Sequence, residues 1–223
     1  MALSITFLGH AGFIFEDGTH ALVVDPYISD NPVATHDPDS ITADYVALTH
    51  GHFDHMGDTV SIATRNGATA VAPLEICNYL GEQGVENLEP ANIGGTIKTD
   101  FGSLTFTQAL HSSSYQGRYM GMPTGIVISM GGVTFYHAGD TGLFSDMQLI
   151  GELYKPDIAA IPVGDRFTMD AALGTRAAEM IGAKHAIPIH FATFPLLAPN
   201  AKGFAPKGVE VKEMTPGETW TYK

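Results

Sequence analysis

The sequence predicts an α/β fold in which two β-sheets pack face to face and helices cover both outer faces, a four-layer αββα sandwich. Short segments rich in Val, Ile, Phe and Tyr gather in two blocks, and each block is followed by segments with helical periodicity. Such sheets bury one face against each other and the other face against helices. With 223 residues, 44% of them hydrophobic, the chain can bury a sizeable core, so we expect residues 1–223 to form one domain.

The first block starts at the N-terminus and contains five predicted strands. They are expected at residues 4–7, 12–16, 20–24, 44–48 and 68–72. Asp17-Gly18 supplies the turn that joins the second and third strands into a hairpin. Helical periodicity predicts helices at 59–65 and 74–81, so the fourth strand, the first helix and the fifth strand form a βαβ unit.

The second block repeats this order of strands followed by helices. Its strands are expected at residues 96–98, 104–110, 125–130, 133–136, 158–163 and 186–189, and its helices at 145–154 and 170–181. Gly131-Gly132 forms a hairpin turn, and a β-rich tail ends near Trp220.

Charge and hydropathy limit the partners of the chain. Its 11 basic and 24 acidic side chains give a net charge of −13, which repels phosphate backbones and anionic membrane surfaces, so we expect a small-molecule substrate and no nucleic acid or membrane partner. The sequence has no apolar run of transmembrane length and no basic, cleavable leader at its start. We therefore expect a soluble, cytoplasmic protein.

The single cysteine, Cys77, lies in the predicted helix at 74–81. It has no cysteine partner for an intramolecular disulfide, and helical spacing favours a position in the core over a role as nucleophile.

Four candidate metal ligands fall within six residues, in His50-Gly-His52-Phe-Asp54-His55. Imidazole nitrogens and carboxylate oxygens bind zinc and related divalent ions well. In an extended segment side chains alternate, so His50 and His52 share one face, and a bend at Gly51 and Phe53 lets Asp54 and His55 approach a second point. One segment is thus able to serve two metals.

Further candidate ligands lie near the ends of other predicted strands. His111 follows the strand at 104–110, Asp140 follows the strand at 133–136, and His190 follows the strand at 186–189. A single His-rich loop has a plain structural explanation as a polar surface segment. Strand ends at one edge of a sheet, however, are a common place for ligands to converge, which favours a shared metal site.

These motifs resemble the metallo-β-lactamase superfamily along the whole chain. The resemblance rests on His50 to His55, His111, Asp140 in Ala-Gly-Asp-Thr, and His190. Three shorter motifs resemble the small single-domain group related to L-ascorbate-6-phosphate lactonase, which contains many metal-dependent hydrolases: Gly9-His10-Ala11, Val24-Asp25-Pro26 and Pro188-Ile-His190-Phe.

The resemblance implies a dinuclear centre. It places His50, His52 and His111 at a first metal, Asp54, His55 and His190 at a second, and Asp140 between both. The two ions would hold a bridging hydroxide that attacks the substrate, with Asp54 as a ligand and possible catalytic base. Without a thiolate ligand, zinc is the first expectation and manganese the second, and nickel or iron also fits.

Three more residues have weaker assignments beside the metals. His10 either supports a metal ligand through a hydrogen bond or is itself an extra ligand, or else it is a structural histidine. Asp25 is expected to orient a metal-bound imidazole, with a turn cap before Pro26 as the alternative. His137 points either into the cleft or into the interface between the sheets.

Substrate-binding candidates come from two loops that flank the ligands. They are Tyr115, Arg118, Arg166 and Thr168. An arginine there is able to hold a phosphate or carboxylate, although solvated loop arginines are common. The Pro-rich segment 194–206 is expected to form a lid or an oligomer contact, so the chain is a possible homo-oligomer.

Hydrolysis of an ester-like bond, in a lactone or a phosphodiester, is the leading prediction. A β-lactamase is disfavoured by the opening and late motifs, and a thioesterase of the glyoxalase II type by the short chain after His190. A diiron oxidoreductase would carry a carboxylate in place of His52 and a flavin domain. A non-catalytic metal-binding protein would tolerate loss of ligands, yet all seven are intact.

Overall fold

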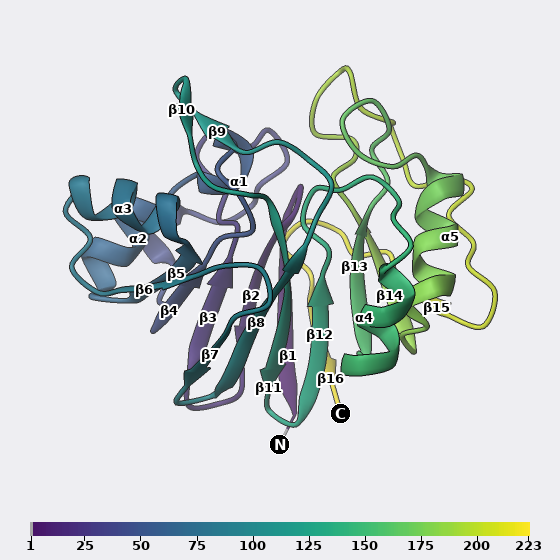
Figure 1. Cartoon of the computed structure of the whole chain (residues 1–223), viewed down its shortest axis with the longest axis horizontal. Coiled ribbons are helices and arrows are strands. Elements are labelled where there is room, and N and C mark those ends of the chain that lie inside the picture. Colours follow the sequence, from purple (N-terminus) through teal and green to yellow (C-terminus); the bar gives the residue numbers. More distant parts are fainter. Residues whose placement is uncertain (1) are drawn as a thin grey trace.

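The computed structural model describes residues 2–223 and contains two seven-stranded sheets flanked by helices (Figure 1). The first half contains β1 (Leu3–Gly9), β2 (Gly12–Glu16), β3 (Ala21–Val24), a 3-10 turn (Pro38–Ser40), β4 (Tyr45–Ala47), α1 (Phe53–Met56), α2 (Thr59–Asn66), β5 (Thr69–Pro73), α3 (Leu74–Glu82) and β6 (Leu88–Ala91). The second half contains β7 (Thr96–Thr99), β8 (Gly102–Gln108), β9 (Ser114–Tyr115), β10 (Arg118–Tyr119), β11 (Thr124–Met130), β12 (Val133–His137), α4 (Met147–Tyr154), β13 (Ile158–Pro162), α5 (Ala171–Ile181), β14 (His185–Ile189), β15 (Glu210–Val211) and β16 (Thr219–Tyr222).

The strand order brings one set of strand ends to a common edge in each sheet. The first sheet has the order β16-β1-β2-β3-β4-β5-β6, and the second has β15-β14-β13-β12-β11-β8-β7. In the first sheet, β1 and β3 both run antiparallel to β2, and β4 runs parallel to β3. In the second sheet, β8 and β12 both run antiparallel to β11, while β13 and β14 continue parallel to β12. The carboxyl ends of β1, β3 and β4 therefore share one edge, as do those of β8, β12 and β14.

Three separate apolar layers hold the sandwich together, and they confirm the predicted αββα fold. Between the sheets, side chains such as Phe13 and Phe15 of β2 pack against Phe135 of β12. A second layer lies under α2 and α3, and a third lies under α4 and α5. Figure 1 shows α2 and α3 on one side of the paired sheets and α4 and α5 on the other.

Most predicted strands and helices match the observed ones to within two residues at each end. Four short elements were not predicted: the 3-10 turn, α1, the β9–β10 hairpin and β6. β6 is an edge strand that contains Pro90 and an exposed Glu89, so its sequence lacks strand periodicity and only its pairing with β5 defines it. The tail forms β16, the edge strand beside β1 in the first sheet, and β15, the edge strand beside β14 in the second.

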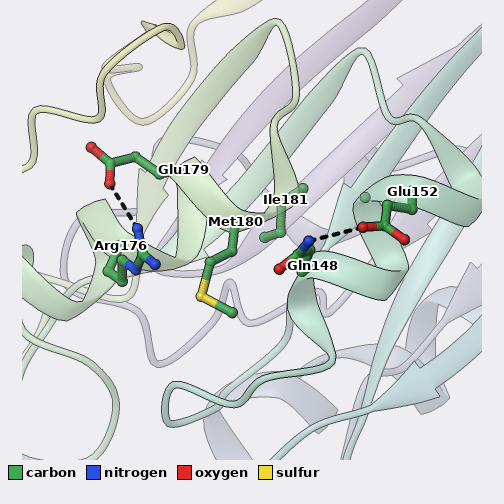
Figure 2. A pocket seen from close by; sticks show the side chains of 7 residues that line it. Gln148, Glu152, Arg176, Glu179, Met180 and Ile181 are labelled. Atoms are coloured by element: carbon green, nitrogen blue, oxygen red, sulfur yellow. Dashed lines mark hydrogen bonds and ion pairs between the residues drawn. The ribbon is translucent and has the colours of Figure 1, made fainter.

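The outer helices α4 and α5 approach each other closely at Gly151. A Cβ atom there would collide with the carbonyl oxygen of Ile181, so a larger residue would push the helices apart. Figure 2 shows the groove beside this crossing, where Gln148 Nε2 donates to Glu152 Oε1 at 2.9 Å and Arg176 pairs with Glu179. None of the predicted ligands lines this groove.

Among residues 2–223, no helix has the length and apolar character needed to cross a bilayer.

Cys77 should be inert in the folded protein. It is buried against β5 on the inner face of α3, and burial raises the pKa of its thiol to about 11. At pH 8 the thiolate, which is the reactive form, is therefore a fraction of roughly one in a thousand. We expect no reaction of Ellman's reagent with the native protein within minutes, and one equivalent of reacted thiol per chain in 6 M guanidinium. The released thiolate is measured at 412 nm, with glutathione as the control. Fast release from native protein would contradict this burial.

Candidate metal centre

The strand ends deliver the candidate ligands to one place. From the first sheet, His10 follows β1, and the segment from His50 to His55 follows β4. From the second sheet, His190 directly follows β14, while His111 and Asp140 come three residues after the ends of β8 and β12. The site therefore lies between the two sheets at their common edge, and both sheets must be formed before it is complete.

One group of ligands consists of His50, His52, His111 and Asp140, whose ligand atoms all lie within 4.8 Å of one another. His50 Nε2 is 3.0 Å from His52 Nδ1. The imidazoles of His52 and His111 lie edge to face with ring centroids 5.0 Å apart. Three imidazoles and one carboxylate thus point at a single small volume, a donor set typical of a divalent metal site.

The second group consists of His10, Asp54, His55 and His190, again within 4.8 Å of one another. Asp54 and His55 lie in α1, a single helical turn that replaces the predicted bend. Asp54 Oδ2 lies 3.0 Å from His10 Nε2 and 3.7 Å from His190 Nε2.

The Asp140 carboxylate lies between the two groups. Its Oδ2 is 3.5 Å from His111 Nε2 and 3.9 Å from His50 Nε2, both in the first group. The same oxygen is 2.9 Å from His190 Nε2, and Oδ1 is 3.4 Å from His55 Nε2, both in the second group. The structure thus brings together all seven residues that the resemblance assigned, with Asp140 in the position from which it can contact two ions.

The backbone around the site adopts conformations that ordinary residues avoid. His10, Asp25 and His190 have φ angles of 58°, 46° and 60°, in the left-handed region. Each such residue costs on the order of 1 kcal/mol, and this kind of strain gathers at functional sites. Gly51, between two ligands, is required for a different reason, because a Cβ there would collide with the Met120 side chain.

Asp25 holds one of the ligand imidazoles in position. Its Oδ2 accepts hydrogen bonds from His55 Nδ1 at 2.7 Å and from Thr49 Oγ1 at 2.6 Å, and its Oδ1 accepts one from Thr49 N at 2.8 Å. Because Nδ1 of His55 is engaged, Nε2 is the nitrogen that faces Asp140 and the site. A carboxylate that orients an imidazole in this way is a regular feature of metal centres.

His10 contacts Asp54 through one nitrogen and Thr193 through the other. Burial, together with the charge of His190, lowers the pKa of His10 to about 4, so its ring is neutral. The Nε2–H then donates to Asp54 Oδ2, and Nδ1 lies 2.9 Å from the Thr193 hydroxyl oxygen. In this arrangement His10 orients the Asp54 carboxylate.

His137 lies in the interface between the sheets and has no nitrogen left for a metal. Its Nε2 donates to the Ala11 carbonyl at 2.8 Å, and its Nδ1 accepts from Gly139 N at 3.0 Å. Of the two positions expected for His137, the one in the interface between the sheets is therefore confirmed, and a position in the cleft as a further ligand is wrong. It has a positioning role instead, because its bond to Gly139 fixes the turn that carries Asp140.

The carboxylates of the site are ionised. Burial raises the pKa of Asp140, but the neighbouring His190 and His55 outweigh this effect and hold it well below the ordinary value. Burial also raises the pKa of Asp54, but hydrogen bonds from His10 and His190 outweigh this effect and hold the pKa below its ordinary value. The converse holds for His190, because burial lowers its pKa but Asp140 and Asp54 raise it to about 9. Two anionic groups at the centre of a buried cluster favour the entry of a cation.

The residues present fit a divalent metal. His55 Nε2 and Asp140 Oδ1 are buried and have no hydrogen-bond partner. A buried polar atom without a partner is costly, and most folded proteins avoid it. Both atoms point into the region where the two groups meet, so bound ions would satisfy them.

A cavity of about 590 Å³ opens above the site. Five of the predicted ligands form its floor: His52, Asp54, His111, Asp140 and His190. Ser112 also lines it, and the rest of the lining is an apolar rim that consists of Phe53, Phe167, Phe194, Pro195 and Leu196. The volume suits a small-molecule ligand.

The structure places the four predicted substrate-binding residues outside this cavity. Arg118 pairs with Glu82 on the surface, and Tyr115 packs against Tyr79. Arg166 and Thr168 flank Phe167, which is the residue of that loop that lines the cavity. These four predictions are therefore wrong for the cavity, because the first loop contributes Ser112 to its lining and the second contributes the ring of Phe167.

The comparisons with known proteins agree with this geometry. Residues 20–191 match the family model described as the beta-lactamase superfamily domain. The chain is 45% identical over 225 residues to a UPF0173 metal-dependent hydrolase of Carboxydothermus hydrogenoformans, which covers 97% of this chain and 98% of that protein. The corresponding protein of Bacillus subtilis is 42% identical, over 97% of this chain and 99% of that protein.

Among solved structures, the chain is similar to Igni18, a metallo hydrolase from the archaeon Ignicoccus hospitalis. The identity is 36% and the TM-score 0.90, with 100% of this chain and 99% of that chain covered. The chain therefore belongs to the beta-lactamase superfamily. Within it, the chain is a member of the family of metal-dependent hydrolases that these relatives form.

Two substitutions should separate a shared ligand from an orienting residue. Asp140→Ala removes the carboxylate between the two groups, so we expect fewer than about one ion per chain after zinc loading and desalting. His10→Ala should retain two ions at saturating zinc, with affinity for one of them lowered about 10- to 100-fold. The measurement is metal content by mass spectrometry, with His36→Ala, in the loop before β4, as the control. Loss of one ion in saturated His10→Ala would instead make His10 a ligand.

Proposed function

We propose that this chain is a metal-dependent hydrolase that uses two divalent ions to cleave an ester-like bond in a small molecule, a lactone or a phosphodiester. The observation that carries the proposal is the position of Asp140 between two groups of buried imidazole and carboxylate ligands. The names of the relatives support hydrolysis and metal dependence.

The proposal assigns the seven ligands to two ions. His50, His52 and His111 would hold one ion, and Asp54, His55 and His190 would hold the other, with Asp140 shared. Such a pair of ions, when bound, supplies activation of water near neutral pH and polarisation of the substrate oxygen. The nitrogen and oxygen donors suit zinc first and manganese second, and nickel or iron also fits.

Asp54 is the residue of this chain that is placed to orient the nucleophilic water. Its side chain lines the cavity floor, and its lowered pKa keeps it able to accept a hydrogen bond. His10 fixes the carboxylate by donating to Oδ2 at 3.0 Å. A carboxylate held in this way orients water for attack.

Metal removal and substitution of Asp54 test the proposal. With bis-p-nitrophenyl phosphate and simple γ-lactones, we expect turnover by zinc- or manganese-loaded protein, loss of it after chelation and dialysis, and recovery when the ion is returned. Asp54→Asn should lower kcat by about a hundredfold or more at saturating metal. The control is Asp157→Asn, at a residue that pairs with Lys184 at the amino ends of β13 and β14, the strand ends opposite the site.

Absence of turnover on every ester, lactone and phosphodiester by protein with two ions bound would count against the enzyme and favour a metal-binding protein without catalysis. Turnover that survives complete removal of metal would count against metal dependence.

A further inference from the structure

Exposed apolar side chains are concentrated at the rim of the cavity. Phe53, Phe167 and Leu196 are 57%, 51% and 56% exposed, and all three line the same opening. Phe194 and Pro195 complete the ring. Single exposed apolar residues are common on proteins, but a contiguous group beside a polar floor is typical of a ligand-binding site.

Aromatic contacts join the rim to the floor. The rings of Phe53 and Phe194 have centroids 6.0 Å apart, and Phe194 lies 5.4 Å from the ring of His10. Tyr27 packs beneath both phenylalanines, 5.9 Å from Phe53 and 6.2 Å from Phe194. A molecule held by the rim is therefore directly above the candidate metal ligands.

The loops that carry Phe167 and Phe194 are hydrogen-bonded to each other. Ala192 N donates to Ala198 O at 2.8 Å, and Ala198 N donates to Gly164 O at 2.8 Å, which ties the loop of Phe194 to the loop of Phe167. Gly164 allows this approach, because a Cβ there would collide with the His190 carbonyl. The rim is therefore preformed, and little ordering entropy opposes binding.

No lysine or arginine lines the cavity among residues 2–223. The nearest candidate, Arg166, lies with Cζ 5.9 Å from the centroid of the Phe167 ring but is not part of the lining, and Arg118 is paired with Glu82. A charged group on the distant part of a substrate would thus lose its hydration against apolar walls without gaining a partner.

We infer that the cavity selects substrates whose non-reacting part is an uncharged, apolar chain or ring, with Phe167 and Phe194 as specificity-determining residues. This inference rests on the proposed function, and it favours alkyl or aryl esters and lactones over phosphorylated sugars and nucleotides. The reacting group lies on the histidine and aspartate floor, and the apolar part lies against the rim.

Binding of analogues that cannot be hydrolysed tests the inference separately from catalysis. The probes are 2-alkylcyclopentanones, in which a ring carbon replaces the lactone oxygen, titrated into metal-loaded protein by calorimetry. We expect Kd to fall about threefold for each methylene from methyl to pentyl, roughly 80-fold in total. A probe of the pentyl length that ends in a carboxylate should bind at least about tenfold more weakly than the pentyl compound.

Substitutions in the rim should remove this dependence on chain length. Phe167→Ala and Phe194→Ala should each reduce the 80-fold gain to less than about tenfold. Because Phe194 also contacts the ring of His10, Phe167→Ala is the cleaner variant. Leu153→Ala, at a 64% exposed position of α4 outside the cavity, is the matched control and should bind like the wild type, as should Arg166→Ala.

A Kd that does not change with chain length, or tighter binding of the carboxylated probe, would overturn the inference. Hydrolysis of γ-lactones by the same preparations decides the proposed function independently. Binding that depends on chain length without any turnover would support the specificity of the cavity and refute catalysis. Turnover without such a dependence would support catalysis and refute the specificity.

Discussion

The buried Asp140 carboxylate imposes the strongest constraint on this molecule. It is only 2% exposed, and an isolated ionised carboxylate in such a place would be strongly unfavourable. Imidazoles from both sheets surround it, with His190 at 2.9 Å, and His137 fixes the turn before it. Because these residues come from distant parts of the chain, the charge is compensated only when the two sheets are packed together.

The arrangement of strands explains how one edge meets this requirement. Parallel neighbours place successive loops at the same edge, and the apolar layer between the sheets, with Phe13, Phe15 and Phe135 at its centre, sets their spacing. The loops can then adopt the left-handed backbone of His10, Asp25 and His190, because rigid strands on both sides determine their path. Stability is thus concentrated in the layers, and strain is concentrated where the ligands are.

The sequence predicted the layers and the ligand cluster because both depend on local patterns. Strand and helix periodicity reflects burial on one face, and the spacing from His50 to His55 is contained in six residues. What it missed depends on long-range contacts. β6 exists only through its pairing with β5, and the role of Arg118 was decided by Glu82, which is 36 residues away in the chain.

The Phe53 side chain shows how one segment can serve two physical tasks. It lies between His52 and Asp54, so the turn of α1 that directs those ligands toward the floor also directs the ring into the rim. Exposure of a large ring is unfavourable unless a ligand covers it, whereas the exposure of a polar residue at this position would cost nothing. Part of the polar floor, His52 and Asp54, and part of the apolar rim, Phe53, are therefore carried by three consecutive residues, so one turn of backbone sets the position of the rim ring relative to two of the floor ligands.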